Sequence, residues 1–200
     1  MKDAMAYVIL LFKLVQAILL VVFAVFISDF RQKTQMVPFV HRAFIIVLKG
    51  IYLIPLSIYG WSLLSLVELA IYDAFALILT SFGTFLVVKG KVDLGTEHAW
   101  TGYRRDDTQI VTSGIYSYIR PPIYLGIFLF IAGGVCSSLP RISWALIGAG
   151  SLTLCYITSF LTLSARRESH HLTVAWGNDY QRYKQQVHPF LPIRRFRKAG

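Results

Sequence analysis

Five long apolar segments constrain the fold of this 200-residue sequence more than any other feature. A helix needs about 20 mostly apolar residues to cross a bilayer, and each segment is close to that length. They are Met5–Ile27, Ala43–Val67, Leu69–Val88, Pro122–Leu139 and Ile142–Leu163. The 56% hydrophobic and 15% charged content also lies outside the usual balance of soluble domains. The sequence therefore predicts an all-α integral membrane protein with five transmembrane helices, the first of them a retained anchor.

Basic residues indicate the orientation, because connections rich in Lys and Arg remain cytoplasmic. They follow the first and third segments and fill the tail, whereas the second connection has none and the fourth has only Arg141. Five spans with an external N-terminus place all three basic regions in the cytoplasm, together with the C-terminus. This distribution explains the net charge of +10 without nucleic acid as a partner. The basic end, Ile193–Lys198, is instead typical of a contact with anionic membrane lipids.

Two features of the first three segments bear on packing. Pro55 is expected to bend the second segment, since proline removes a backbone donor and clashes with the preceding turn. Lys13 and Lys49 lie near helix ends and can reach the interface, an interpretation that we prefer to an ion pathway. Residues 1–88 are thus predicted to form a three-helix scaffold, and residues 89–200 a catalytic part.

The last two apolar segments form an antiparallel hairpin, because only a couple of residues around Pro140 and Arg141 join them. Their cytoplasmic ends, near Arg120 and Glu168, are therefore expected to be neighbours. The connector before them, Lys89–Arg120, is longer than a simple connection needs, which is typical of a functional loop.

The tail after the fifth segment predicts a short amphipathic helix. Gly177 is a helix stop, and Tyr180, Tyr183 and Val187 then lie on one helical face. This helix either folds back over the neighbouring ends of the hairpin or lies on the membrane surface.

The polar cluster at Ser113–Gly126, reading SGIYSYIRPPIYLG, is the main candidate for chemistry. Arginine can bind a carboxylate through two parallel hydrogen bonds, and tyrosine faces attract cations. Together with Glu168, Arg120 and its tyrosines would suit a small zwitterion with a positive centre. From the residues alone, an interfacial belt that anchors the helix ends explains them equally well.

Other catalytic signatures are absent from the sequence: it has no G-x-S-x-G, no H-E-x-x-H and no glycine-rich phosphate loop. His170 and His171 are adjacent, so on a helix they point about 100° apart. With His98 and His188 they make a poor metal site, and no metal is expected.

Three groups of residues resemble the isoprenylcysteine carboxyl methyltransferase family. They are Asp93-Leu94-Gly95 with Trp100, Ile110–Tyr116 with Arg120–Gly126, and a tail with Glu168, Leu172, Trp176-Gly177, Tyr180 and Tyr183 before Pro189. The resemblance runs from Asp93 to Pro192, about half the chain, in the order that the family has around its helical hairpin.

This resemblance implies a membrane-embedded methyltransferase that uses S-adenosylmethionine. Its methyl acceptor would be lipophilic and would enter from the bilayer. The acceptor group would be a carboxylate or a thiol, as in a prenylcysteine-like compound. Carried over by position, the cofactor pocket would comprise Gly114, Tyr116, Arg120, Pro122, Tyr124, Glu168 and Tyr180. Arg120 and Glu168 would be the catalytic pair.

Two positions depart from the family pattern. Pro121 stands where the family has a histidine, and Ser169 stands where it has a second acid. These departures keep open a non-catalytic membrane protein that retains the fold. A second alternative is an NADPH-dependent membrane lipid or sterol reductase, although 200 residues are few for that class.

Overall fold

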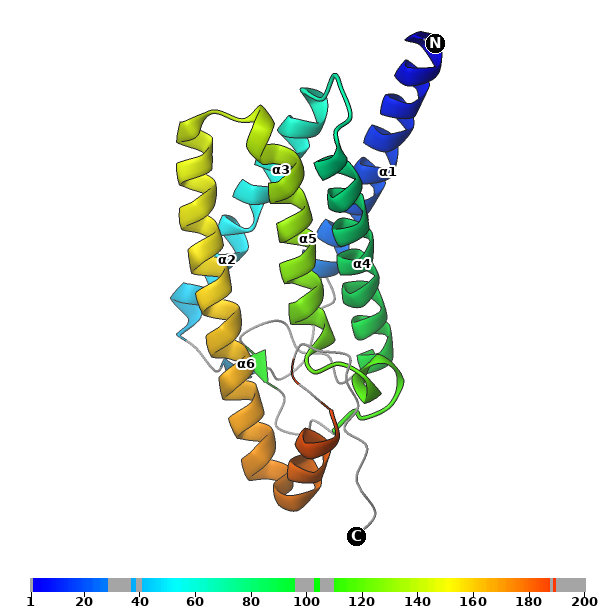
Figure 1. Ribbon diagram of the computed structural model, residues 1–200. Coiled ribbons are helices and arrows are strands. Elements are labelled where there is room, and N and C mark those ends of the chain that lie inside the picture. The colour runs from blue at the N-terminus through cyan, green and yellow to red at the C-terminus, as the bar shows by residue number, and fades with distance from the viewer. Residues whose placement is uncertain are drawn as a thin grey trace.

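The computed structural model describes residues 2–28, 37–38, 41–95, 103–104, 110–187 and 189. Over these ranges the chain is a bundle of long helices that run up and down (Figure 1). Five helical segments are long and apolar enough to cross a membrane, which confirms the predicted class of an all-α integral membrane protein. The helices are α1 (Lys2–Ser28), α2 (Arg42–Ile51), α3 (Leu53–Leu64), α4 (Ile71–Leu94), η2 (Gly114–Ser117), α5 (Pro122–Ser138), η3 (Leu139–Arg141) and α6 (Trp144–Gln186). The two strands, β1 (Val37–Pro38) and β2 (Tyr103–Arg104), pair antiparallel.

The second membrane span is broken into α2 and α3 at Tyr52, as Pro55 led us to expect. The two pieces still count as one span, Ala43–Leu64. Because proline lacks an N–H group, the helix loses a hydrogen bond one turn before it, and the break lies in that turn.

The helices α4 and α5 pack closely through small residues. A methyl group on Gly83 would lie 2.7 Å from the Gly126 carbonyl oxygen, and one on Gly126 would lie 2.7 Å from that of Gly83. Such backbone-to-backbone contact is typical of helices in lipid. Apolar side chains gain little free energy by moving from lipid into a helix interface, so close packing of small residues holds the helices together.

A buried ion pair joins the two connections at the end of the bundle opposite the predicted site. Arg141 donates to Asp73 through Nη1 at 2.8 Å and through Nη2 at 2.6 Å, and Asp73 is 1% exposed. Ser137 Oγ donates to the same carboxylate at 2.9 Å. This pair fixes the start of α4 against the end of the α5–α6 hairpin, and the sequence did not indicate it.

The helix α1 is attached to the bundle by polar contacts. Thr80 Oγ1 donates to Gln16 Oε1 at 2.9 Å, and Gln16 is completely buried. Lys13 Nζ donates to the Leu64 carbonyl oxygen at 3.2 Å, at the end of α3. Lys13 therefore ties the middle of α1 to the end of α3.

Two predicted helix ends were placed too early. The third span does not end at Val88 but continues to Leu94, so Lys89 and Lys91 lie on α4 and not in the connector. Lys89 pairs with Asp93 one turn later, which supports the added turn. The fifth span continues past Leu163 as far as Gly177, whose backbone is non-helical (φ 47°, ψ −118°). The predicted stop at Gly177 and the short helix after it are confirmed.

Candidate functional site

The seven predicted site residues gather at one end of the bundle. There η2, the start of α5 and the second half of α6 meet below the end of α4, and the last helical turns fold back toward them (Figure 1). Gly114 and Tyr116 belong to η2, Arg120 precedes α5, and Pro122 and Tyr124 lie in its first turn. Glu168 and Tyr180 lie on α6, on opposite sides of the break at Gly177. The hairpin thus brings together residues that are up to 66 positions apart in the sequence.

Asp93, at the end of α4, holds η2 in place. Its Oδ2 accepts a hydrogen bond from the Ile115 backbone N at 2.7 Å, and its Oδ1 pairs with Lys89 Nζ at 2.5 Å. Gly114 has a positive φ of 61°, and a methyl group there would lie 2.3 Å from Asp93 Oδ2. Position 114 therefore requires glycine for backbone geometry and for the close approach of this carboxylate.

The tail folds back over η2, which is the first of the two arrangements that the sequence allowed. Tyr183 donates its hydroxyl to the Tyr116 carbonyl oxygen at 2.7 Å. Tyr180, Tyr183 and Val187 are buried together against Ile110 and Leu172. The predicted apolar face of this short helix thus packs on the protein.

Tyr116 is enclosed by this arrangement. Burial, with the Glu168 carboxylate nearby, raises the pKa of the Tyr116 hydroxyl well above its ordinary value. The hydroxyl therefore stays neutral at physiological pH and remains a hydrogen-bond donor.

Arg120 lies between the tail and α5 with its charge incompletely satisfied. Its guanidinium carbon is 5.7 Å from the centre of the Tyr180 ring and 5.8 Å from that of Tyr183. Its Nη1 is buried and makes no hydrogen bond. Aromatic faces offset only part of the cost of a desolvated cation, so the guanidinium is free to bind an anionic ligand.

Glu168 is held against the start of α5 by a contact across the hairpin. The Tyr124 hydroxyl donates to Glu168 Oε2 at 3.1 Å, joining α5 to α6. Tyr124 is buried, and no ion pair between Arg120 and Glu168 occurs in the described part of the chain. The site therefore holds a carboxyl group and a guanidinium that make no direct ion pair with each other.

The two residues that depart from the family pattern have structural partners. Ser169 Oγ accepts a hydrogen bond from the Tyr180 hydroxyl at 3.3 Å, so this serine helps to hold the tail closed. Pro121 precedes α5, and its carbonyl oxygen accepts from Leu125 N at 3.3 Å. Pro121 starts the helix but offers no side-chain hydrogen bond to the site.

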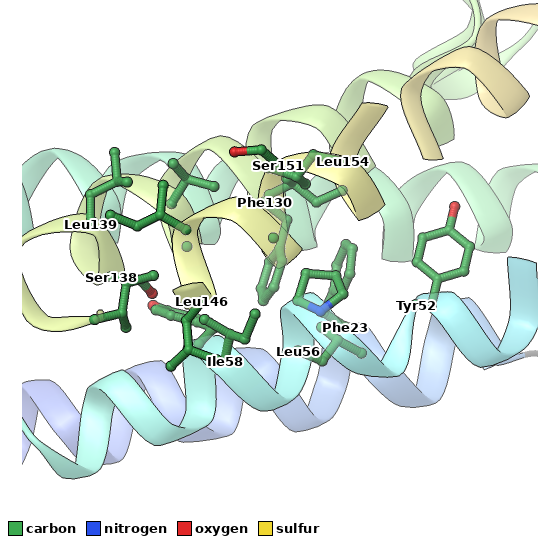
Figure 2. A pocket seen from close by; sticks show the side chains of 18 residues that line it. Phe23, Tyr52, Leu56, Ile58, Phe130, Ser138, Leu139, Leu146, Ser151 and Leu154 are labelled. Atoms are coloured by element: carbon green, nitrogen blue, oxygen red, sulfur yellow. The ribbon is translucent and has the colours of Figure 1, made fainter. Parts of the chain in front are cut away.

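An apolar groove lies farther along the bundle, between α3, α5 and α6 (Figure 2). Tyr52 stands at one end of it and Ser138 and Leu139 at the other. The Tyr52 hydroxyl is buried without a hydrogen-bond partner, and so is Ser164 Oγ on α6. Sequence reasoning missed both residues, because neither lies in a motif and each resembles an ordinary packing residue of a membrane helix.

Several residues considered in the sequence lie outside the described ranges. They are His98, Trp100, His188 and the basic end Ile193–Lys198. Within the described ranges, no three His, Cys, Asp or Glu side chains are grouped as a metal would require.

The fold and the site define an integral membrane protein with a cluster of polar side chains at one end of a helical hairpin. The phospholipid methyltransferase family model matches residues 71–179, more than half of the chain. The chain therefore belongs to the phospholipid methyltransferase family.

Two curated proteins are similar to this chain. The protein-S-isoprenylcysteine O-methyltransferase of Schizosaccharomyces pombe is 26% identical over 129 residues, which cover 62% of this chain and 51% of that protein. The protein of the same name from Dictyostelium discoideum is 33% identical over 89 residues, 44% of this chain and 35% of that protein. The chain thus spans about half or less of the curated relatives that it matches. The predicted resemblance to isoprenylcysteine methyltransferases is confirmed.

Proposed function

We propose that the protein is a methyltransferase that uses S-adenosylmethionine and acts on a lipophilic acceptor at the cytoplasmic membrane face. The observation that carries this proposal is Arg120, whose buried Nη1 lacks a hydrogen-bond partner and whose guanidinium lies against two tyrosine rings. Both the family and the curated relatives are named as methyltransferases.

The residues present suit the charges of this cofactor. Arg120 Nη1 is a buried donor without an acceptor, and a carboxylate of the ligand would satisfy it. The Glu168 carboxylate and the nearby tyrosine rings provide a negative environment for a positively charged group. Gly114, Tyr116 and Pro122 would line the pocket, and Tyr180 would close it from the tail.

The task of the protein in such a reaction is positioning. When bound, S-adenosylmethionine supplies a methyl group on a sulfonium, and its transfer to a carboxylate or thiolate neutralises both charges. Arg120 and Glu168 would orient the cofactor, and the folded tail would exclude water. Since a carboxylate or thiolate is already a nucleophile, the site needs no general base.

The acceptor class follows from the relatives and from the membrane setting. Both relatives are named for isoprenylcysteine, a lipidated residue that carries a carboxylate. We infer that a prenylcysteine-like compound enters from the bilayer while the cofactor enters from the cytoplasm. The first 88 residues would serve as the scaffold and residues 89–200 as the catalytic part. Since α4 runs across residue 88, this is a division of roles and not of folding units.

A binding experiment with two cofactors tests the proposal. The full chain would be purified, placed in lipid nanodiscs and titrated with radiolabelled S-adenosylmethionine and, separately, with NADPH. We expect saturable binding of S-adenosylmethionine and none of NADPH. Binding of NADPH alone would favour a reductase, and binding of neither would favour a non-catalytic protein.

A further inference from the structure

Two hydrogen bonds fasten the last turns of α6 to the turns that precede the break at Gly177. The Tyr180 hydroxyl donates to Ser169 Oγ at 3.3 Å, and Lys184 Nζ donates to Thr173 Oγ1 at 3.0 Å. The two acceptors are one helical turn apart on α6, and so are the two donors after the break. Neither Lys184 nor Thr173 belongs to a sequence motif described above, so their contact has no role in the proposed function.

The Thr173 hydroxyl is oriented to receive the lysine. It donates to the Ser169 carbonyl oxygen at 2.7 Å, so a lone pair of Oγ1 remains for the Lys184 ammonium group. Lys184 and Thr173 are both half-buried, and within the described ranges no carboxylate forms an ion pair with Lys184. Because a charged donor makes a stronger hydrogen bond than a neutral one, this contact is a firm attachment between the tail and α6.

The Tyr180 ring connects this attachment to the candidate site. Lys184 Nζ lies 5.2 Å from the centre of that ring, and the Arg120 guanidinium carbon lies 5.7 Å from it. Both distances are within the range in which a cation is attracted to an aromatic face. The ring itself is 3% exposed and packs beside that of Tyr183. The position of Arg120 therefore depends on Tyr180, and the position of Tyr180 depends on Lys184.

Two positive charges beside one ring also favour an anion. Arg120 Nη1 is buried without an acceptor, and in the described part of the chain neither Arg120 nor Lys184 pairs with a carboxylate. Salt screens partly buried charges less than exposed ones. The ammonium group of Lys184 therefore adds to the attraction that Arg120 exerts on an anionic group of a ligand.

We propose that Lys184 and Thr173 are positioning residues for the carboxylate of the cofactor. Lys184, fixed on Thr173, holds the Tyr180 ring against the Arg120 guanidinium, and the guanidinium presents its unpaired Nη1 to the carboxylate. This inference rests on the proposed function and adds two residues to it. Both residues act through Tyr180 and not by contact with the ligand.

The chain offers conservative variants and a matched control. Lys184→Met keeps the length of the side chain but removes its charge and donor, whereas Lys184→Arg keeps both. Thr173→Val keeps the shape and removes the hydroxyl, whereas Thr173→Ser keeps the hydroxyl. Arg182→Met is the control, because Arg182 follows the same break and has a side chain that is 77% exposed.

The binding test compares two ligands that differ only in the carboxylate. The full chain in lipid nanodiscs would be titrated by calorimetry with S-adenosylmethionine and with its decarboxylated form. We expect Lys184→Met and Thr173→Val each to weaken binding of S-adenosylmethionine about fivefold and to change binding of the decarboxylated form less than about twofold. Lys184→Arg, Thr173→Ser and Arg182→Met should match the unmodified protein. The double variant should be no weaker than either single one, because the two residues share one contact.

An equal loss for both ligands would overturn the proposal, because it would show that the variants merely loosen the tail. The same loss in Arg182→Met as in Lys184→Met would also overturn it.

A second measurement needs no cofactor. Phenylglyoxal modifies arginine side chains, and mass spectrometry of the digested protein gives the rate for Arg120 alone. We expect Lys184→Met and Thr173→Val to raise this rate several-fold, because the Tyr180 ring no longer covers the guanidinium in a fixed position. Arg182→Met should leave it unchanged. An unchanged rate in both variants would refute the positioning role.

The two measurements separate this inference from the proposed function. Faster modification of Arg120 in a protein that binds no S-adenosylmethionine would support the positioning of Arg120 by Lys184 and refute the proposed cofactor. Equal binding of S-adenosylmethionine by all variants would leave the proposed function intact and refute the positioning role.

Discussion

Arg120 is the residue on which the proposed chemistry depends most. It combines a buried, unpartnered Nη1 with two tyrosine faces, an arrangement that a point charge on a flexible stem cannot reproduce. We predict that Arg120→Lys weakens the binding of S-adenosylmethionine at least tenfold, measured by calorimetry in nanodiscs. The control is Arg182→Lys, since Arg182 has a side chain that is 77% exposed. Unchanged affinity in Arg120→Lys would show that this arginine does not bind the cofactor.

The buried ion pair between Asp73 and Arg141 allows a prediction about stability. Because removal of one partner leaves the other charge buried, Asp73→Ala should lower the free energy of unfolding by about 3–5 kcal/mol. Reversible unfolding in mixed micelles would measure this. Replacing both residues with leucine should restore part of the loss, and a double variant as unstable as the single one would contradict this account.

Among the elements, the short helix after Gly177 has a role that can be separated from the membrane bundle. Among the described residues it contacts η2, Ile110, Arg120 and the preceding turns of α6, and its buried residues form a cluster separate from the core between the membrane helices. We predict that removal of residues 180–200 leaves the five spans folded but abolishes methyl transfer. Circular dichroism and size-exclusion chromatography would establish the fold, and labelled methyl transfer the loss. A truncated protein that remains active would show that the tail does not close the site.

The membrane elements show what could be predicted from the sequence and what could not. Hydropathy and length located all five spans. The short turn at Pro140 and Arg141 implied that the other ends of the hairpin meet, and the hydrogen bond from Tyr124 to Glu168 joins those ends. The contributions of Tyr52, Ser164 and Asp73 were not predictable, because each depends on how one helix is rotated against another. Hydrophobicity all around a membrane helix hides that rotation. The extension of the third span to Leu94 and of the fifth span past Leu163 was missed because polar residues can extend a helix beyond the apolar core.

For the whole molecule, the orientation in the membrane is the main prediction. The basic connections place the tail in the cytoplasm and the turn between α5 and α6 outside. After replacement of Cys136 and Cys155, a cysteine at Ser143 should react with a membrane-impermeant maleimide in intact cells. A cysteine at Asn178 should react only after permeabilisation. The reverse pattern would place the site on the other side of the membrane.

The contacts that hold η2 also bear on how this architecture changes over evolution. Asp93 binds the Ile115 backbone N, and Tyr183 binds the Tyr116 backbone carbonyl. Both partners are main-chain atoms, which every residue type but proline supplies in full. Substitutions at 115 and 116 can therefore alter the chemistry of the pocket wall while the frame persists. Proteins that share this frame can therefore differ in the side chains of the pocket wall without any change of fold.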